Sequence, residues 1–246
     1  MAGSSDRDEI LARFRTKRDW GARLRAVAGA LDRPDADDLL AEMYRLAISP
    51  DGALIAAHLG DLEGAAGSAV LRDAARATGP GTQMLRCAAL VALAKRDDEQ
   101  ATPLLREALR SRDGVVKEYA LIGLAGAGND DVWDDVAARL ALLVRKRFED
   151  HASPTPVIWS VAYLGRHTRE DRDRRLRLVS LARRQWSRRI PEEIDWFARY
   201  WPAVMPGGAS DELVGSPDAD ALMAWVRSEP MFAPAGWLVD WYRRLD

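Results

Sequence analysis

Two stretches of the chain share one pattern of residues, 31 positions apart. LRCAALVALAKRDDEQATPLLREAL occupies residues 85–109, and VKEYALIGLAGAGNDDVWDDVAARL occupies residues 116–140. Aligning each residue with the one 31 positions later gives the pairs Leu85 and Val116, Arg86 and Lys117, Ala89 and Ala120, Leu90 and Leu121, Leu93 and Leu124, and Ala94 and Ala125. Each copy reads as a helix, a polar break and a second helix. Because one such pair cannot bury its apolar face alone, the pattern predicts stacked helix pairs that share a core.

The pattern continues more faintly on both sides. SPTPVIWSVAYLGRH, from residue 153, places Val157, Val161 and Leu164 where apolar residues are required, after a step of about 40 residues. The preceding helix is expected to run to about Arg147, and the partner helix is expected over 170–188. We therefore expect recognisable repeats over residues 50–188.

The two ends of the chain depart from the repeat. Residues 1–6 read as a loose tail. Other helices are expected at residues 10–31, from 35 to a buried Leu46, at 54–59, 62–77 and 191–201, and from 217 to about 226. Seven of the nine Trp residues lie beyond residue 150. Since the last repeat of a stack must be covered, residues 190–246 are predicted to form a Trp-rich C-terminal helical cap.

The composition favours an all-α fold in a single domain over residues 1–246. Ala, Leu and Arg, which favour helices, dominate the sequence, and β-branched residues rarely alternate with polar ones. No apolar run approaches the roughly 20 residues of a membrane span, and no secretory signal precedes the first helix. A single cysteine, Cys87, leaves no internal disulfide. These features predict a cytoplasmic protein that is not bound to a membrane.

The residues of the 31-residue echo resemble the HEAT-repeat family, within the wider armadillo/HEAT group. The resemblance is strongest over residues 82–147 and rests on Leu85, Ala89, Leu90 and Leu93 and their counterparts in the second copy. It implies an α-α superhelix, a HEAT-like helical repeat solenoid. It also implies a binding scaffold, because HEAT families mostly act in that way.

No residue stands out as catalytic, and no cofactor or metal site is expected. The three histidines, His58, His151 and His167, lie far from one another and from Cys87 in the sequence. Metal centres and nucleophilic dyads need closely spaced or paired ligands. Cys87 lies within a first-helix motif, where a small buried side chain suits the packing. No phosphate-binding loop, dinucleotide fingerprint or nucleophile elbow is present.

Three pairs of adjacent carboxylates have a structural interpretation. Asp97-Asp98 and Asp130-Asp131 fall in the breaks between helices, and Asp134-Asp135 fall in the first turn of a second helix. Carboxylates at these places accept hydrogen bonds from free helix N–H groups and favour the positive helix end. We therefore expect helix capping in preference to acid–base chemistry.

Trp133 raises one enzymatic alternative. HEAT-like-repeat DNA glycosylases carry a Trp and, four residues later, a catalytic Asp. VWDDVAARL is similar at Trp133 and Asp134, but the position four residues after Trp133 is Ala137. The resemblance therefore implies at most a degenerate glycosylase that lacks this carboxylate.

Positive charge is concentrated in one part of the chain. Residues 145–189 hold 13 Lys or Arg against 5 Asp or Glu, although the whole chain carries a net charge of −2. Acid–arginine pairs such as Asp173 with Arg177 are expected to neutralise the start of the 170–188 helix. RRQWSRR, residues 183–189, has no acidic partner within that helix. The residues expected to bind a partner are Arg145, Arg147, Arg177, Arg184 and Arg188.

Three functions remain open from the sequence. The first is a non-catalytic scaffold or adaptor, whose solenoid groove and basic residues bind an acidic segment of a protein. The second is a nucleic-acid-binding module or degenerate glycosylase, although a pI near 6.0 is low for a dedicated nucleic-acid binder. The third is an unrecognised enzyme with a pocket between the repeats and the cap.

Overall fold

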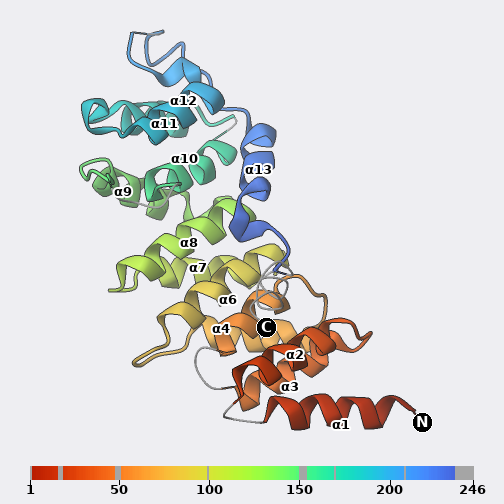
Figure 1. The fold of residues 1–246 in the computed structure, drawn as a ribbon. Helices are drawn as coiled ribbons and strands as arrows, with labels where there is room; N and C mark the ends of the chain where they lie inside the picture. Colours follow the sequence, from red (N-terminus) through yellow and green to blue (C-terminus); the bar gives the residue numbers. More distant parts are fainter. Residues whose placement is uncertain are drawn as a thin grey trace. The chain divides into compact units, whose positions relative to one another are not determined.

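All regular secondary structure in the described part of the chain is helical. The computed structural model describes residues 2–15, 19–47, 51–98, 100–149, 154–168, 170–207 and 209–235. These residues contain no strand (Figure 1), which confirms the all-α prediction. The α-helices are α1 (Ala2–Phe14), α2 (Trp20–Leu31), α3 (Ala36–Leu46), α4 (Asp51–Leu59), α5 (Ala65–Ala75), α6 (Gln83–Lys95), α7 (Ala101–Leu109), α8 (Gly114–Ala127), α9 (Trp133–Leu143), α10 (Pro156–Arg166), α11 (Arg172–Arg183), α12 (Pro191–Tyr200) and α13 (Ala219–Ser228).

Four helices begin at nearly equal steps along the chain. The helices α2, α4, α6 and α8 start at Trp20, Asp51, Gln83 and Gly114, which are steps of 31, 32 and 31 residues. A second helix follows each of them after a turn. The regular spacing of helix starts therefore extends from residue 20 to residue 114.

The chain divides into two compact units. The first comprises residues up to Leu104 together with the segment that begins at Ala233. In this unit α4 packs against α3, α5 and α6, and α5 also packs against α3 and α6. Its centre consists of side chains with no exposed surface, among them Leu39, Leu40, Met43, Ile55, Leu59, Leu71, Leu90 and Leu93.

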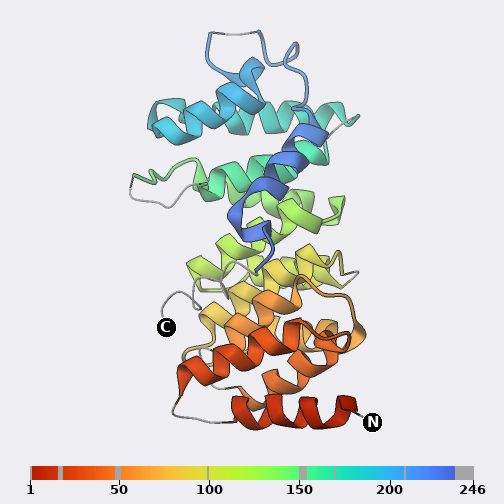
Figure 2. The same cartoon turned by 45° about the vertical axis from the view of Figure 1, so that its right-hand side comes forward.

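The second unit comprises Leu105–Phe232. Here α8 packs against α10, and α9 packs against α11. Figure 2 shows α13, in blue, lying across α8 and α10, with which it is in contact. At Gly165 of α10 a Cβ atom would lie 2.5 Å from Pro217 Cγ, so only glycine permits this close approach.

Aromatic rings gather where α13 covers the second unit. The ring centroids of Trp159 and Trp225 lie 4.8 Å apart, and those of Trp196 and Trp225 lie 5.3 Å apart. The Nε1 atom of Trp201 donates to the carbonyl oxygen of Gly215 at 2.8 Å. Trp237 and Trp241, the last two tryptophans of the predicted cap, lie outside the described residues.

The residues expected in the core of the repeats are all buried. The side chains with no exposed surface include Ala89, Leu90, Leu93, Ala120, Leu121, Leu124 and Leu164. Burial of these positions is therefore confirmed. Leu46 was also expected to be buried, but it is 40% exposed because it is the last residue of α3.

The N-terminal helices differ from the prediction in two ways. Helix α1 begins at Ala2, so residues 2–6 are helical where a loose tail was expected. Arg7 forms ion pairs with Asp35 at 2.7 Å and Glu42 at 2.8 Å, and these long-range contacts hold the start of α1. The expected 10–31 helix is also divided in two, because the Asp19 side chain caps a new helix by accepting from the N–H of Ala22.

Two helices of the second unit end earlier than the sequence suggested. Helix α9 ends at Leu143 instead of about Arg147, and α11 ends at Arg183 instead of Arg188. After α11 the chain turns at Gln185, whose φ of 56° lies in the left-handed region. This turn ends the helix and brings Arg189 into the interior.

Arg189 takes part in a buried ion pair. Its Nη1 lies 3.3 Å from Oε2 of Glu193, and the two side chains are 2% and 3% exposed. The Thr155 hydroxyl donates to the other oxygen of Glu193 at 2.7 Å, and Nη2 of Arg189 donates to the carbonyl oxygen of Ala182. Burial lowers the pKa of Arg189, and the charge of Glu193 opposes this shift. The pair thus connects the starts of α10 and α12 with the end of α11.

Replacing Glu193 by Ala is expected to reduce the free energy of unfolding by about 3–5 kcal/mol, because Arg189 is left buried without its counter-charge. Urea unfolding followed by circular dichroism measures the change. The matched control is Glu192→Ala, since Glu192 is exposed in the same helix turn. Equal stability of the two variants would show that the pair does not hold these helices.

Ala120→Arg is expected to prevent folding or cause aggregation, because it places a long charged side chain at a fully buried position of α8. Ala138→Arg is the control, since Ala138 is exposed on α9. The melting temperature and the amount of monomer on gel filtration measure both variants. An unchanged melting temperature for Ala120→Arg would contradict the packing described above.

Candidate functional site

Helices α9 and α11, together with the residues that follow each of them, lie side by side. Near their start, Arg177 of α11 forms an ion pair with Asp134 of α9. Beyond their ends, Nη1 of Arg188 donates to the carbonyl oxygen of Arg145 at 2.7 Å. Both contacts join residues 43 positions apart. The two segments therefore adjoin at Asp134 and Arg177 and again at Arg145 and Arg188.

The starts of the two helices are neutralised around Trp133. The guanidinium carbons of Arg174 and Arg177 each lie 5.3 Å from the centre of a Trp133 ring. Arg174 pairs with Asp130 at 3.1 Å, and Arg177 pairs with Asp134. Two cations thus face two carboxylates here, so this end of the surface carries little net charge.

These ion pairs correct the predicted pairing within the helix. Arg177 was expected to pair with Asp173, four residues earlier, but it pairs with Asp134 of α9. Asp171 caps α11 by accepting from the N–H of Arg174 at 2.9 Å. The acid needed to neutralise Arg177 therefore comes from a neighbouring helix, which a single-helix pattern cannot reveal.

The expected carboxylate caps are confirmed only in part. Asp98 accepts from the N–H of Gln100 at 2.8 Å and from Arg72. Burial alone would raise the pKa of Asp98, but the hydrogen bonds from Arg72 and Gln100 outweigh it and lower that pKa. In the other break the capping side chain is Asn129, which accepts from the N–H of Asp131.

Asp135, a member of the third carboxylate pair, forms an ion pair instead of the expected cap. It lies 2.7 Å from Nε of Arg106 and 3.6 Å from Nη2 of Arg110. This pair joins α9 to α7.

Five exposed cations lie beyond the ends of α9 and α11. We call Arg145, Lys146, Arg147, Arg184 and Arg188 the basic cluster. The structure brings Arg188 to Arg145, and Arg184 is the exposed residue that follows α11. Of the sequence-predicted binding residues, Arg177 lies apart, in the neutral region around Trp133.

The basic cluster has little acidic compensation. Among the described residues only Arg147 has a carboxylate partner, Glu149 at 2.7 Å. Arg188 is bound to a backbone oxygen, which leaves its positive charge unopposed. Arg145, Arg147, Arg184 and Arg188 were predicted from the sequence as partner-binding residues, and Lys146 was not.

The other arginines of 183–189 serve the fold. Arg183 forms an ion pair with Asp211 and donates to the carbonyl oxygens of Val204 and Ala209. Arg189 belongs to the buried pair with Glu193. The prediction named no acidic partner within the helix, and the acids that neutralise these two arginines come from the chain beyond it.

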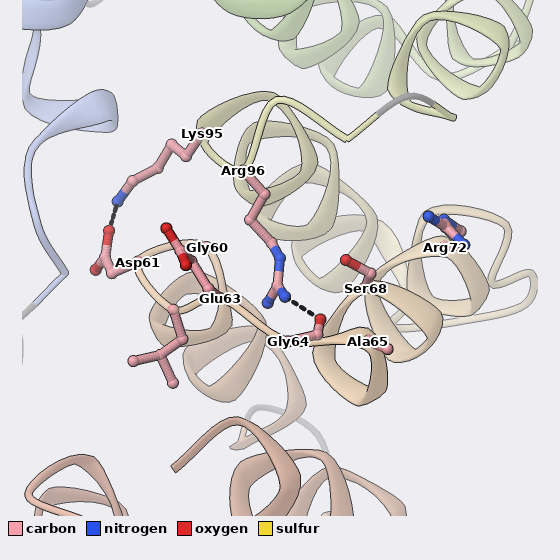
Figure 3. Close-up of a pocket in the computed structure, with 10 residues that line it drawn as sticks. Gly60, Asp61, Glu63, Gly64, Ala65, Ser68, Arg72, Lys95 and Arg96 are labelled. Carbon is pink, nitrogen blue, oxygen red and sulfur yellow. Dashed lines mark hydrogen bonds and ion pairs between the residues drawn. The ribbon is translucent and has the colours of Figure 1, made fainter. Parts of the chain in front are cut away.

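A separate cavity of about 640 Å³ lies in the first unit, between the α4–α5 turn, α5 and the end of α6. Figure 3 shows Arg96 and Arg72 on its wall, with Lys95 directed toward Asp61. Each cation already has a carboxylate partner. Arg96 pairs with Asp37 at 2.9 Å, Arg72 pairs with Asp98 at 2.8 Å, and Lys95 pairs with Asp61.

The cavity cations also bind the backbone. Nη1 of Arg96 donates to the carbonyl oxygen of Leu59 at 2.8 Å, and Nζ of Lys95 donates to that of Ala233 at 2.9 Å. Asp61 accepts from the N–H of Ala235 at 2.5 Å. Because these side chains join segments of the first unit, we assign the cavity a structural role.

Two of the residues considered for catalysis, Cys87 and His58, are buried, and His167 is half-buried. Cys87 has no exposed surface, and His58 is 1% exposed. Burial lowers the pKa of His58 to about 4 and that of His167 to about 4. His151 lies outside the described residues. Across the described ranges, no group of three or more His, Cys, Asp or Glu side chains is placed to hold a metal ion.

Trp133 is not available as a stacking surface. It is 1% exposed, and its Nε1 donates to the Thr168 hydroxyl at 3.1 Å and to the carbonyl oxygen of Leu164 at 3.3 Å. Arg174 and Arg177 cover the ring. The geometry around Trp133 is therefore that of a packed core residue.

Comparison of the chain with protein-family models, curated proteins and solved structures finds no match in any of the three. No helix in the described part is long and apolar enough to cross a membrane. Only the chain's own residues therefore indicate its function.

Acidification is expected to destabilise the protein through His58. The folded-state pKa of about 4 lies below the unfolded value of about 6.5, so the unfolded state binds the proton first. The stabilising contribution is present above pH 6.5 and is lost as the pH falls toward 4, by about 3 kcal/mol. In His58→Gln, unfolding curves measured between pH 7 and 4 should show a smaller loss of stability. The same pH slope in both proteins would contradict the assignment.

Proposed function

We propose that the chain is a non-catalytic, HEAT-like helical-repeat scaffold that binds an acidic segment of a protein partner. The steps of 31, 32 and 31 residues between the starts of α2, α4, α6 and α8 support the repeat. Within the second unit, the packing of α8 on α10 and of α9 on α11 suits successive repeats. A reducing cytoplasm suits a chain whose single cysteine is a buried thiol.

The basic cluster is the observation that carries the binding proposal. Five cations converge there from two segments, and Glu149 is the one carboxylate that pairs with them in the described structure. Arginine side chains suit carboxylates because the planar guanidinium donates two parallel hydrogen bonds. An acidic peptide segment supplies such groups with the required charge.

Nucleic acid is the less favoured ligand of the same cluster. Phosphates also bind arginine, but dedicated nucleic-acid binders are usually strongly basic, whereas this chain has a net charge of −2. Trp186, which lies between Arg184 and Arg188 in the sequence, packs against Phe197 with ring centroids 5.3 Å apart.

Charge reversal tests the proposal. Arg184→Glu with Arg188→Glu should weaken binding of a fluorescein-labelled polyglutamate peptide by about tenfold or more at low salt, because attraction becomes repulsion. The loss should be smaller at high salt, where screening already weakens the attraction. Fluorescence anisotropy measures both affinities, and the melting temperature checks folding.

The control is Arg199→Glu with Arg227→Glu, which changes the net charge equally at exposed positions of α12 and α13. Equal losses for the two double variants would attribute binding to overall charge and overturn the proposal. Tighter binding of a random DNA duplex than of the peptide would favour the nucleic-acid alternative.

A further inference from the structure

An exposed leucine lies beside the basic cluster. Leu142, in the last turn of α9, is 52% exposed. Arg145 lies three residues further along its own segment, and Arg188 donates to the carbonyl oxygen of Arg145. Leu142 therefore lies about one turn of chain before the point where two cations of the basic cluster meet.

Small side chains precede Leu142 on this surface. Ala138 is exposed on α9 one turn earlier, and Ser180 is exposed on α11 almost opposite it. Beyond them the ion pair of Asp134 and Arg177 closes the surface with balanced charge. The accessible strip thus changes from small and neutral residues to an apolar residue and then to cations.

We propose that the acidic segment bound by this protein carries one large apolar side chain, which covers Leu142. This inference rests on the proposed function and specifies its partner. Carboxylates beside that side chain bind Arg145 and Arg188, which meet three residues beyond Leu142. The partner motif is therefore acidic with a single apolar anchor, and a purely acidic segment leaves Leu142 in water.

The physical argument is that charge and apolar contact contribute differently. Exposed ion pairs are individually weak and are screened by salt, so they orient a segment more than they hold it. Burial of an apolar side chain against Leu142 adds free energy that depends little on moderate salt. The combination gives both selection for an acidic segment and discrimination among acidic segments.

Another exposed leucine provides a matched comparison. Leu213 is 77% exposed in the same unit, but it follows Asp211 and Glu212 in a loop. Both acids are paired with arginines, Asp211 with Arg183 and Glu212 with Arg172, so this leucine lies beside neutralised charge. Substitution of Leu213 therefore removes an equally large exposed side chain without touching the proposed contact.

The test uses two fluorescein-labelled peptides, a run of glutamates with one central leucine and the same run with serine at that position. The wild-type protein should bind the leucine peptide about fivefold more tightly, as expected for partial burial of one apolar side chain. This ratio should persist at high salt. Leu142→Ser should reduce the ratio to about one, whereas Leu213→Ser should leave it unchanged.

The outcomes separate the two proposals. If charge reversal of Arg184 and Arg188 weakens both peptides but Leu142→Ser leaves their ratio unchanged, the acidic partner stands and the apolar anchor is wrong. If neither peptide binds the wild-type protein, or charge reversal has no effect, the proposed function fails and the anchor fails with it. Loss of the preference in Leu213→Ser as well would also overturn the assignment to Leu142.

Discussion

Arginine–aspartate pairs between helices set the register on which the rest of this structure depends. Apolar packing favours burial but has little directionality, so leucine and alanine faces alone permit helices to slide. In the first unit Arg96 reaches Asp37 of α3, and in the second Arg106 and Arg177 reach Asp135 and Asp134 of α9. The pair of Arg96 and Asp37 is nearly buried, with side chains 5% and 11% exposed, and fixes α6 against α3. The two pairs of the second unit are more exposed and contribute less.

Sequence periodicity was sufficient to predict the helices and much of the core. Ala89 and Ala120 are equivalent in the echo, and both are fully buried. The ends of helices were less predictable because they depend on distant residues. Arg7 holds α1 through Asp35 and Glu42, and α11 ends early where the chain turns to bury Arg189. No local pattern contains that information.

The candidate site was predicted as a set of charges but not as an arrangement. Arg188 does contact Arg145, whereas Arg177 and Arg183 are neutralised by Asp134 and Asp211, which lie far away in the sequence. The sequence of a single helix can indicate only ion-pair partners that lie three or four residues away. Leu142 was missed for the same reason, since its exposure depends on how α9 packs against α11.

The ion pair of Lys95 and Asp61 has a consequence for the order in which the chain acquires its structure. It binds the backbone at Ala233 and Ala235, so the first unit includes residues from both sides of the second. During synthesis the ribosome completes Leu105–Phe232 before it delivers the last segment of the first unit. The first unit, most of which is synthesised first, therefore completes its contacts only after the second unit has been synthesised. Until then, Lys95 and Asp61 lack their backbone partners at Ala233 and Ala235.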